Sequence, residues 1–298
     1  MENAKNVLTP FEDKKSERWG YVDGYGKTII FPQFANAGNF SEGLAPAQKI
    51  KLLGRIAGKF FVIIISAISK FYGEGEQGLQ NIFGGKYGYI DMVGKFVIKP
   101  QYNWAGNFSE GLARARIGDK WNRWGKYGYI GKFGNFIIAP VFDDAEDFHN
   151  GFAYIEWQPA TKPVGFSYKG QIYKTGEIKV NTESFPSFMT ERFSEGLAYI
   201  DINYKFGYIN KAGDFVIEPQ FDDADKFSEG LARINIGGKW TSYSSFCQGG
   251  YWGFIDKSGD IIIQPQYHTA ESFINGIAKV GVSGKYFYIN KKGEVIKE

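Results

Sequence analysis

Residues 251–280 read YWGFIDKSGDIIIQPQYHTAESFINGIAKV, and most of the chain consists of copies of this unit. The unit contains a short phrase that occurs four times as FSEGLA and twice in altered form. The four copies begin at Phe40, Phe108, Phe193 and Phe227, and the altered forms FHNGFA and FINGIA begin at Phe148 and Phe273. Because repeats share one continuous core, we expect a single repeat domain over residues 1–298.

A glycine that follows an aromatic residue or Lys defines the register of the unit. It occurs at Gly20, Gly88, Gly128, Gly170, Gly207 and Gly253, and a seventh unit has Phe287 there. A second glycine lies six residues further on in all seven units. In five units a proline lies twelve residues on, and the phenylalanine of the phrase lies twenty residues on. Length therefore varies mainly at one junction, between the GLA segment and the next aromatic-Gly segment.

Each unit also contains the signature of a β-hairpin. Two β-branched and aromatic runs are joined by Asp or Asn, two variable positions and Gly, as in YIDMVGKFVI at residues 89–98. The acid or amide side chain can cap the turn, and the glycine takes the left-handed conformation. We expect the proline to end the second run, since it cannot donate to a ladder. The phrase phenylalanine is expected to anchor its loop in the core between neighbouring units.

The pattern predicts an all-β fold of about seven tandem three-stranded β-meanders. Each meander consists of the GLA strand, the aromatic-Gly strand and the Val-Ile strand. The first unit lacks a GLA segment, and VLTPFED from Val7 is expected to supply that strand. Seven units suit a closed, propeller-like arrangement, but an open solenoid array satisfies the same pattern.

The glutamate of the phrase is expected to be a turn residue rather than a catalytic acid. Its position is filled by Glu42, Glu110, Glu195 and Glu229, but by Asn150 and Asn275 in the altered forms, always before glycine. Glu and Asn share little acid–base chemistry, whereas both are compatible with a turn before Gly.

These motifs resemble the WG repeat, also called the KWG repeat, of bacterial proteins. Aromatic-Gly-Tyr-Ile-Asp, x-x-Gly-Lys, Val-Ile-x-Pro and FSEGLA carry the resemblance over nearly the whole chain. The Trp-Gly dipeptide that gives the family its name occurs at the expected repeat position only at Trp19 and Trp252. A further Trp-Gly, Trp124-Gly125, lies outside that position. The resemblance implies an all-β repeat array with a binding or scaffolding role, and it supplies no catalytic residues.

The variable junctions contain the candidate partner-binding residues. If the units stack regularly, these arms lie at one edge, where insertions cost little and binding residues collect. Exposed aromatic residues beside cations are typical contact residues, although they could also pack on each other. The candidates are Trp121, Trp124, Trp157, Trp240, Tyr243 and Phe246.

The longest arm, residues 49–83, is a basic and apolar insertion. Its apolar run from Phe60 to Ile68 is about half of what a transmembrane helix requires. The segment could lie on a membrane surface with anionic lipids, pack on the array, or contact another protein. The candidate contact residues are Lys51, Arg55, Lys59, Phe60 and Phe61.

The rest of the sequence argues against a metal site, a phosphate-binding loop or a nucleic-acid-binding surface. Neither the two histidines nor the single Cys247 has metal-ligand spacing, and no phosphate-binding loop occurs. The pairs Asp143-Asp144 and Asp222-Asp223 could hold Ca²⁺, but other copies read ANAG or NWAG there, which favours turn capping. A net charge of +3 is too small for a nucleic-acid-binding footprint.

We therefore expect a non-enzymatic binding or scaffold protein without a metal or cofactor, whose partner is another protein. The alternative is a peripheral membrane or envelope-associated protein that uses residues 49–83. The first residues show no secretory signal, and one cysteine fits a reducing compartment, which together predict a cytoplasmic location.

Overall fold

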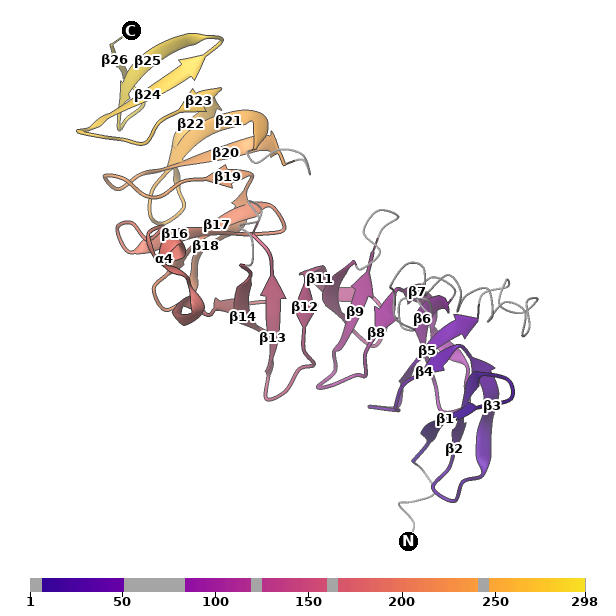
Figure 1. Cartoon of the computed structure of the whole chain (residues 1–298). Coiled ribbons are helices and arrows are strands. Elements are labelled where there is room, and N and C mark those ends of the chain that lie inside the picture. The colour runs from indigo at the N-terminus through magenta and orange to yellow at the C-terminus, as the bar shows by residue number, and fades with distance from the viewer. Residues whose placement is uncertain (1–6, 51–83, 119–124, 160–165, 241–246, 298) are drawn as a thin grey trace, which may run out of the picture. The chain divides into compact units, whose positions relative to one another are not determined.

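The computed structural model describes residues 7–50, 84–118, 125–159, 166–240 and 247–297. These residues form small antiparallel sheets that follow one another along the chain (Figure 1). They belong to two compact units, unit 1 (Met1–Ala153) and unit 2 (Tyr154–Glu298). No described sheet closes into a barrel, which is consistent with an open repeat array. The all-β prediction is confirmed, while the single-domain assignment stays a prediction.

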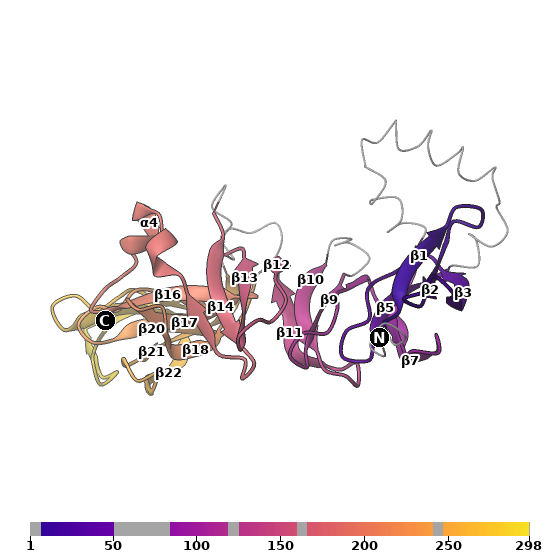
Figure 2. The same cartoon turned by 90° about the horizontal axis from the view of Figure 1, so that it is seen from below.

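Unit 1 contains three sheets, with the strand orders β1-β2-β3, β4-β5-β6-β7 and β8-β9-β10-β11. Figure 2 shows β9, β10 and β11 of the third sheet side by side. The strands are β1 (Thr9–Asp13), β2 (Arg18–Val22), β3 (Thr28–Phe34), β4 (Asn36–Ala37), β5 (Ala45–Ile50), β6 (Gly84–Ile90), β7 (Phe96–Tyr102), β8 (Trp104–Ala105), β9 (Ala113–Ile117), β10 (Lys126–Ile130), β11 (Phe136–Phe142) and β12 (Asp144–Ala145).

Unit 2 contains the sheets β16-β17-β18, β19-β20-β21-β22 and β23-β24-β25-β26, as well as the neighbouring strands β13, β14 and β15 of a further sheet. The strands are β13 (Phe152–Trp157), β14 (Tyr168–Tyr173), β15 (Ile178–Val180), β16 (Leu197–Ile202), β17 (Lys205–Asn210), β18 (Phe215–Phe221), β19 (Asp223–Ala224), β20 (Ala232–Lys239), β21 (Gln248–Ile255), β22 (Ile261–Tyr267), β23 (Thr269–Ala270), β24 (Ile277–Val282), β25 (Lys285–Asn290) and β26 (Val295–Lys297).

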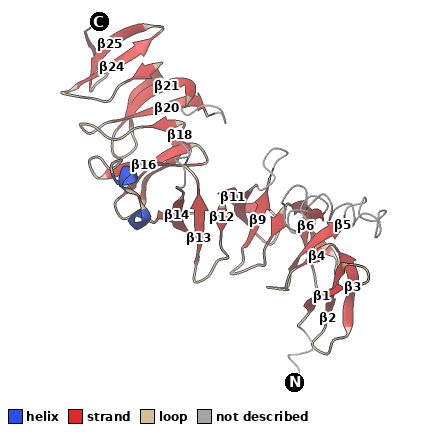
Figure 3. Ribbon diagram, viewed as in Figure 1, coloured by secondary structure: helices blue, strands red, loops and turns tan. Residues whose placement is uncertain are grey.

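The helical residues that the structure describes are confined to the connection between β15 and β16 (Figure 3). They form a 3₁₀ turn (Thr182–Ser184) and the single-turn helix α4 (Ser187–Thr190). Among the described residues, no helix has the length and apolar character needed to cross a bilayer.

The predicted meander is the core of each sheet. The GLA strand pairs with the aromatic-Gly strand, as Ala113 does with Ile130, and the latter pairs with the Val-Ile strand. A two-residue strand that follows the preceding Val-Ile strand adds a fourth member in several sheets, as β8 does beside β9. The expectation for the first unit is also confirmed, because β1 pairs with β2 where a GLA strand would lie.

The turn chemistry agrees with the prediction in the hairpins that have Asp or Asn at the first turn position. In the β6–β7 turn, Oδ1 of Asp91 accepts hydrogen bonds from the backbone N–H groups of Val93 and Lys95, at 3.1 and 2.9 Å. Gly94 has a φ of 85°, the left-handed conformation that glycine adopts at no steric cost.

The proline prediction is wrong, because the third strand continues through Pro100 to Tyr102. The pairing of β6 with β7 shifts register between Tyr87 and Tyr89, so Pro100 lies at a bulge of an edge strand, where a missing N–H is tolerated. Gly88 faces this bulge, and a Cβ on it would lie 2.3 Å from the carbonyl oxygen of Ile98. The aromatic-Gly slot therefore needs glycine for close backbone approach.

Neighbouring repeats share their hydrophobic cores. The first cluster combines Tyr21, Ile30 and Phe34 of the first sheet with Ala45 and Ile90 of the second, all of them buried. This sharing matches the expectation for repeats that cannot bury both faces of a sheet alone.

Candidate functional site

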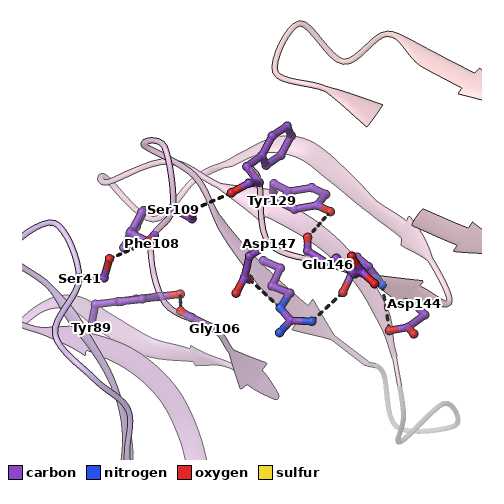
Figure 4. Close-up of polar contacts among 12 residues, drawn as sticks. Ser41, Tyr89, Gly106, Phe108, Ser109, Tyr129, Asp144, Glu146 and Asp147 are labelled. Carbon is purple, nitrogen blue, oxygen red and sulfur yellow. Dashed lines mark hydrogen bonds and ion pairs between the residues drawn. The ribbon is translucent and has the colours of Figure 1, made fainter. Parts of the chain in front are cut away.

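The recurring phrase forms the contact between successive repeats. Its phenylalanine is buried against the aromatic residue after the slot glycine, as in Tyr89–Phe108 with ring centroids 4.9 Å apart. The Tyr89 hydroxyl donates a hydrogen bond to the Gly106 carbonyl at 2.7 Å. The phrase serine reaches the next repeat, because the Ser41 hydroxyl donates to the Phe108 carbonyl at 2.6 Å (Figure 4).

The arginine of the GLAR strand also reaches the next loop in unit 1. Nη1 of Arg114 donates to the Ala145 carbonyl at 2.7 Å, and Nε lies 2.8 Å from Oδ1 of Asp147. In the same loop, the Tyr129 hydroxyl donates to the Glu146 carbonyl, and the Ser109 hydroxyl donates to the Phe148 carbonyl (Figure 4). The recurring polar side chains are therefore engaged in holding one repeat to the next.

The phrase glutamate has the same two roles wherever it occurs. Its backbone is left-handed, with φ between 51° and 54° at Glu42, Glu110, Glu195 and Glu229. Asn150 and Asn275 share that conformation, with φ of 54° and 53°. Asn visits this region more readily than most residues, which explains why Asn replaces Glu in the altered phrases.

The glutamate carboxylate bridges to the following repeats. Glu195 accepts a hydrogen bond from the backbone N–H of Gly230, in the next phrase, at 3.1 Å. The ammonium group of Lys257, in the hairpin turn of that next repeat, lies 2.9 Å from the same carboxylate. The equivalent hydrogen bonds join Glu42 to Gly111, Glu110 to Gly151 and Glu229 to Gly276, and ion pairs join Glu42 to Lys132 and Glu229 to Lys291.

These contacts lower the pKa of Glu195 and Glu229, which is the opposite of the raised pKa that a general acid requires. The Lys257 ammonium group lowers the pKa of Glu195, and the Gly230 N–H adds to this effect against partial desolvation. The Gly276 N–H and then Lys291 lower the pKa of Glu229. The phrase glutamate is thus a structural link between repeats, as expected from its exchange with Asn.

The structure overturns the exposure expected of Trp157. Its side chain is 1% exposed, it packs against Tyr168 with ring centroids 5.3 Å apart, and its indole N–H donates to the Asp201 carbonyl at 2.7 Å. Trp157 occupies the inward-facing position of β13, where alternation along the strand directs it into the core. It is a core residue and cannot contact a partner.

Trp240 is half-buried rather than freely exposed. It stacks on Phe206 with ring centroids 5.8 Å apart, and its indole N–H donates to the Asp222 carbonyl at 2.6 Å. The remaining candidates lie outside the described residues: Trp121, Trp124, Tyr243 and Phe246 in the arms, and Lys51, Arg55, Lys59, Phe60 and Phe61 in the insertion. Their proposed roles stay predictions.

The paired aspartates make local contacts. Asp143 and Asp222 form ion pairs with Lys126 of β10 and Lys205 of β17. Oδ1 of Asp223 accepts a hydrogen bond from the Ala224 N–H at 2.9 Å, and burial raises the pKa of Asp223 to about 6. Within the described ranges, no group of three or more His, Cys, Asp or Glu side chains is placed to hold a metal ion.

An exposed apolar row that the sequence analysis missed lies along unit 1. We call it the unit 1 edge. It comprises the hairpin-tip residues Tyr25, Val93 and Phe133, which are 66%, 79% and 96% exposed, and the third-strand residues Ile29, Phe31, Val97 and Ile137, which are also exposed.

Each hairpin turn packs on the third strand of the preceding repeat: a Cβ on Gly94 would lie 2.8 Å from Cγ2 of Ile30, and one on Gly134 would lie 2.6 Å from Cγ2 of Ile98. The tip of one repeat therefore lies against the third strand of the preceding repeat. That strand also contains the exposed aliphatic residues of the preceding repeat.

Unit 2 does not repeat this apolar row at its tips. The corresponding turn positions are Thr175, Ala212, Ser258 and Lys292. Exposed apolar residues of the third strands are still present in unit 2, at Val216, Ile261, Ile262, Val295 and Ile296. The sequence does show this difference between the units when the repeats are aligned. The residue before the turn glycine is large and apolar in unit 1, but small or polar in unit 2.

Comparisons with known proteins place the chain by its sequence repeat. No curated protein matches it. A crystal structure of a protein of unknown function from Bacteroides caccae is similar over 72% of this chain and 89% of that chain, with 12% sequence identity and a TM-score of 0.21. The family model described as "WG containing repeat" matches residues 19–49, 87–121, 127–156, 206–240 and 252–286. The chain therefore belongs to the WG containing repeat family.

Proposed function

We propose that this WG-repeat protein is a non-enzymatic binding or scaffold protein, whose partner is another protein held at the unit 1 edge. The observation that carries the proposal is the row of three exposed tip residues, Tyr25, Val93 and Phe133. A side chain as exposed as that of Phe133 adds almost nothing to folding stability, since it stays in water. Exposed apolar patches commonly mark contacts with other molecules.

The recurring residues support a binding role indirectly, because their contacts between repeats leave only the other exposed positions to bind a partner. The phrase glutamate, serine and phenylalanine are engaged between repeats, so the positions free to vary lie at the turns and outer strand faces. Variable exposed positions on a rigid repeat framework are where solenoid proteins recognise partners.

The positive charge along the unit 1 edge indicates what kind of partner surface would fit it. Lys27, Lys95 and Lys99 are exposed on the same turns and strands, and their ammonium groups form no ion pair within the residues that the structure describes. A partner surface with apolar residues and acidic neighbours complements such an edge, because opposite charges steer association and apolar burial supplies affinity.

Site-specific photocrosslinking tests this function. A photoreactive phenylalanine analogue is placed at position 133, and at position 258 of a second variant as the matched control, because both are exposed tip residues. The full-length variants are irradiated in native lysate. We expect a discrete protein adduct from position 133 that is absent from position 258 and is lost when Tyr25 and Val93 are changed to Ser.

Adducts of equal yield at both positions, or none at position 133, would refute the unit 1 edge as the binding surface. The variant Trp121→Ala/Trp124→Ala belongs in the same experiment. Loss of the position-133 adduct in that variant would show that the arm also contributes to binding.

A peripheral membrane role is the alternative function, and the apolar run from Phe60 to Ile68 with its flanking basic residues favours it. Co-flotation with vesicles containing phosphatidylserine tests this role. Binding that disappears in the variant Lys51→Glu/Arg55→Glu/Lys59→Glu would support it, and failure of the parent protein to float would exclude it.

A further inference from the structure

Arg116 stands out among the cationic side chains of unit 1. It lies in β9 directly opposite Trp104 of β8 and Tyr127 of β10. The guanidinium carbon lies 5.4 Å from the Tyr127 ring centroid, and the Trp104 and Tyr127 rings are 5.8 Å apart in edge-to-face contact. All three side chains are half-buried.

Arg116 has no counter-ion among the described residues, although its neighbours do. Arg114 lies against Asp147, and Lys126 is paired with Asp143 at 2.6 Å. The Nε atoms of Arg114 and Arg116 are both buried without a hydrogen bond of good geometry, but that of Arg114 lies 2.8 Å from a carboxylate oxygen of Asp147. A buried donor that has lost water and gained no partner is unfavourable, so the Arg116 side chain is held at a cost to stability.

The other repeats show that the fold does not require a cation at this position. The residues in register with Arg116 are Gln48, Glu156, Asp201, Asn235 and Gly281 in the remaining GLA strands. Gln48 is buried, and its amide group donates a hydrogen bond to the Gly85 carbonyl at 2.9 Å. The residue opposite also differs, because Asn36, Asp223 and Thr269 stand where this repeat has Trp104.

We propose that Trp104, Arg116 and Tyr127 form a binding site for an oxyanion, a carboxylate or a phosphate, carried on a flat apolar group. A guanidinium group offers a planar fork of donors that matches either anion. The Tyr127 ring, together with the Trp104 ring that also contacts Arg114 at 5.0 Å, provides apolar surface for the group that carries the anion. This site is separate from the unit 1 edge and does not depend on the proposed function.

Titration of the full-length protein with small probes tests the site. The probes are benzoate and phenyl phosphate, which distinguish the two anions, and benzyl alcohol, which lacks the charge. Binding is followed by the ¹H–¹⁵N signals of arginine Nε and tryptophan indole groups. The variants are Arg116→Gln, which adopts the residue type of position 48, and Lys14→Gln, which removes an equal charge from an exposed position outside both proposed sites.

We expect at least one anionic probe to bind with a dissociation constant of about 1 mM or lower, and benzyl alcohol to bind at least about tenfold more weakly. Arg116→Gln should lose about tenfold or more in affinity, whereas Lys14→Gln should bind like the parent. The thermal midpoint of Arg116→Gln should be equal to or above that of the parent, because an unpaired cation is removed.

Three results would overturn the proposal. They are the absence of saturable binding by both anions, equal affinity of Arg116→Gln and the parent, and a lowered thermal midpoint of Arg116→Gln without any change in binding. The last of these would assign Arg116 to packing of the sheet.

Discussion

At the scale of single residues, the glycine before Tyr or Phe in each aromatic-Gly strand is fixed by backbone contact. A Cβ on Gly128 would lie 2.5 Å from the Ile138 carbonyl oxygen and 2.7 Å from the Pro140 nitrogen. Both are backbone atoms, which cannot move aside as the end of a side chain could. This contact explains why the glycine and the proline occur together, twelve residues apart.

Gly128→Ala should therefore destabilise the protein by about 3 kcal/mol, because the bulge must open to admit a methyl group. Chemical denaturation followed by circular dichroism measures the loss. Gly151→Asn is the matched control, since a Cβ there meets nothing within 4 Å and its φ of 87° is one that Asn adopts better than Ala. A loss at Gly128 no larger than at Gly151 would contradict this explanation.

Asp223 provides a prediction about pH. Burial raises its pKa to about 6 in the folded protein, whereas an aspartate in the unfolded chain titrates near 3.9. The folded state thus holds the proton more tightly, so this group favours folding below about pH 4, and its contribution is lost as pH rises through about 6.

Asp223→Asn, which copies Asn36 at the same position of another repeat, should be more stable than the parent at pH 7 by about 1–3 kcal/mol. Near pH 4 the difference should shrink toward zero. Urea denaturation of both proteins at pH 4 and pH 7 measures it. A difference that does not change between the two pH values would exclude a raised pKa.

At the scale of elements, the hairpin turn shows how much could be read from the sequence. The Asp-x-x-Gly pattern predicted the capped turn and the left-handed glycine because both depend on neighbouring residues alone. The course of the third strand depends on pairing with another strand, so the bulge opposite Gly88 and the continuation through Pro100 could not be predicted locally. Likewise, Trp157 looked like an arm residue because only alternation within β13 directs it inward.

One turn lacks its capping residue and offers a stabilising substitution. Gly131 stands where the other hairpins of unit 1 have Asp23 and Asp91. Gly131→Asp should gain about 0.5–1 kcal/mol, because the carboxylate would accept hydrogen bonds from two turn N–H groups and the unfolded chain would lose freedom. Gly131→Ala is the control, because it lowers the conformational entropy of the unfolded chain without adding a carboxylate to cap the turn. Equal effects of Asp and Ala would show that the capping bonds contribute nothing.

At the scale of the whole chain, the phrase glutamates link successive repeats within each unit. Glu195 contacts the next phrase at Gly230 and the next hairpin at Lys257, and Glu229 does the same with Gly276 and Lys291. The sequence analysis predicted that this glutamate has a conformational role, from its exchange with Asn. It did not predict the contacts between repeats, because residues 35 to 62 positions apart meet only after the units stack.

The candidate binding residues also depend on contacts between distant residues, so the sequence identified them only in part. Aromatic content marked the arms, but content alone does not tell an inward-facing tryptophan from an exposed one. The unit 1 edge depends on the side to which Phe133 and Val93 point, and this becomes visible only when the hairpins are placed against their neighbours.

The most direct test of the central claim, that the phrase glutamate links repeats, is the unfolding free energy of Glu195 variants in urea. We predict that Glu195→Ala loses about 2 kcal/mol, since it forfeits the Gly230 and Lys257 contacts and forces Ala into a left-handed backbone. Glu195→Asn, the residue of the altered phrases, should lose about half as much, because its backbone conformation is tolerated. If Glu195→Ala unfolds at the same urea concentration as the parent, the glutamate does not hold the repeats together.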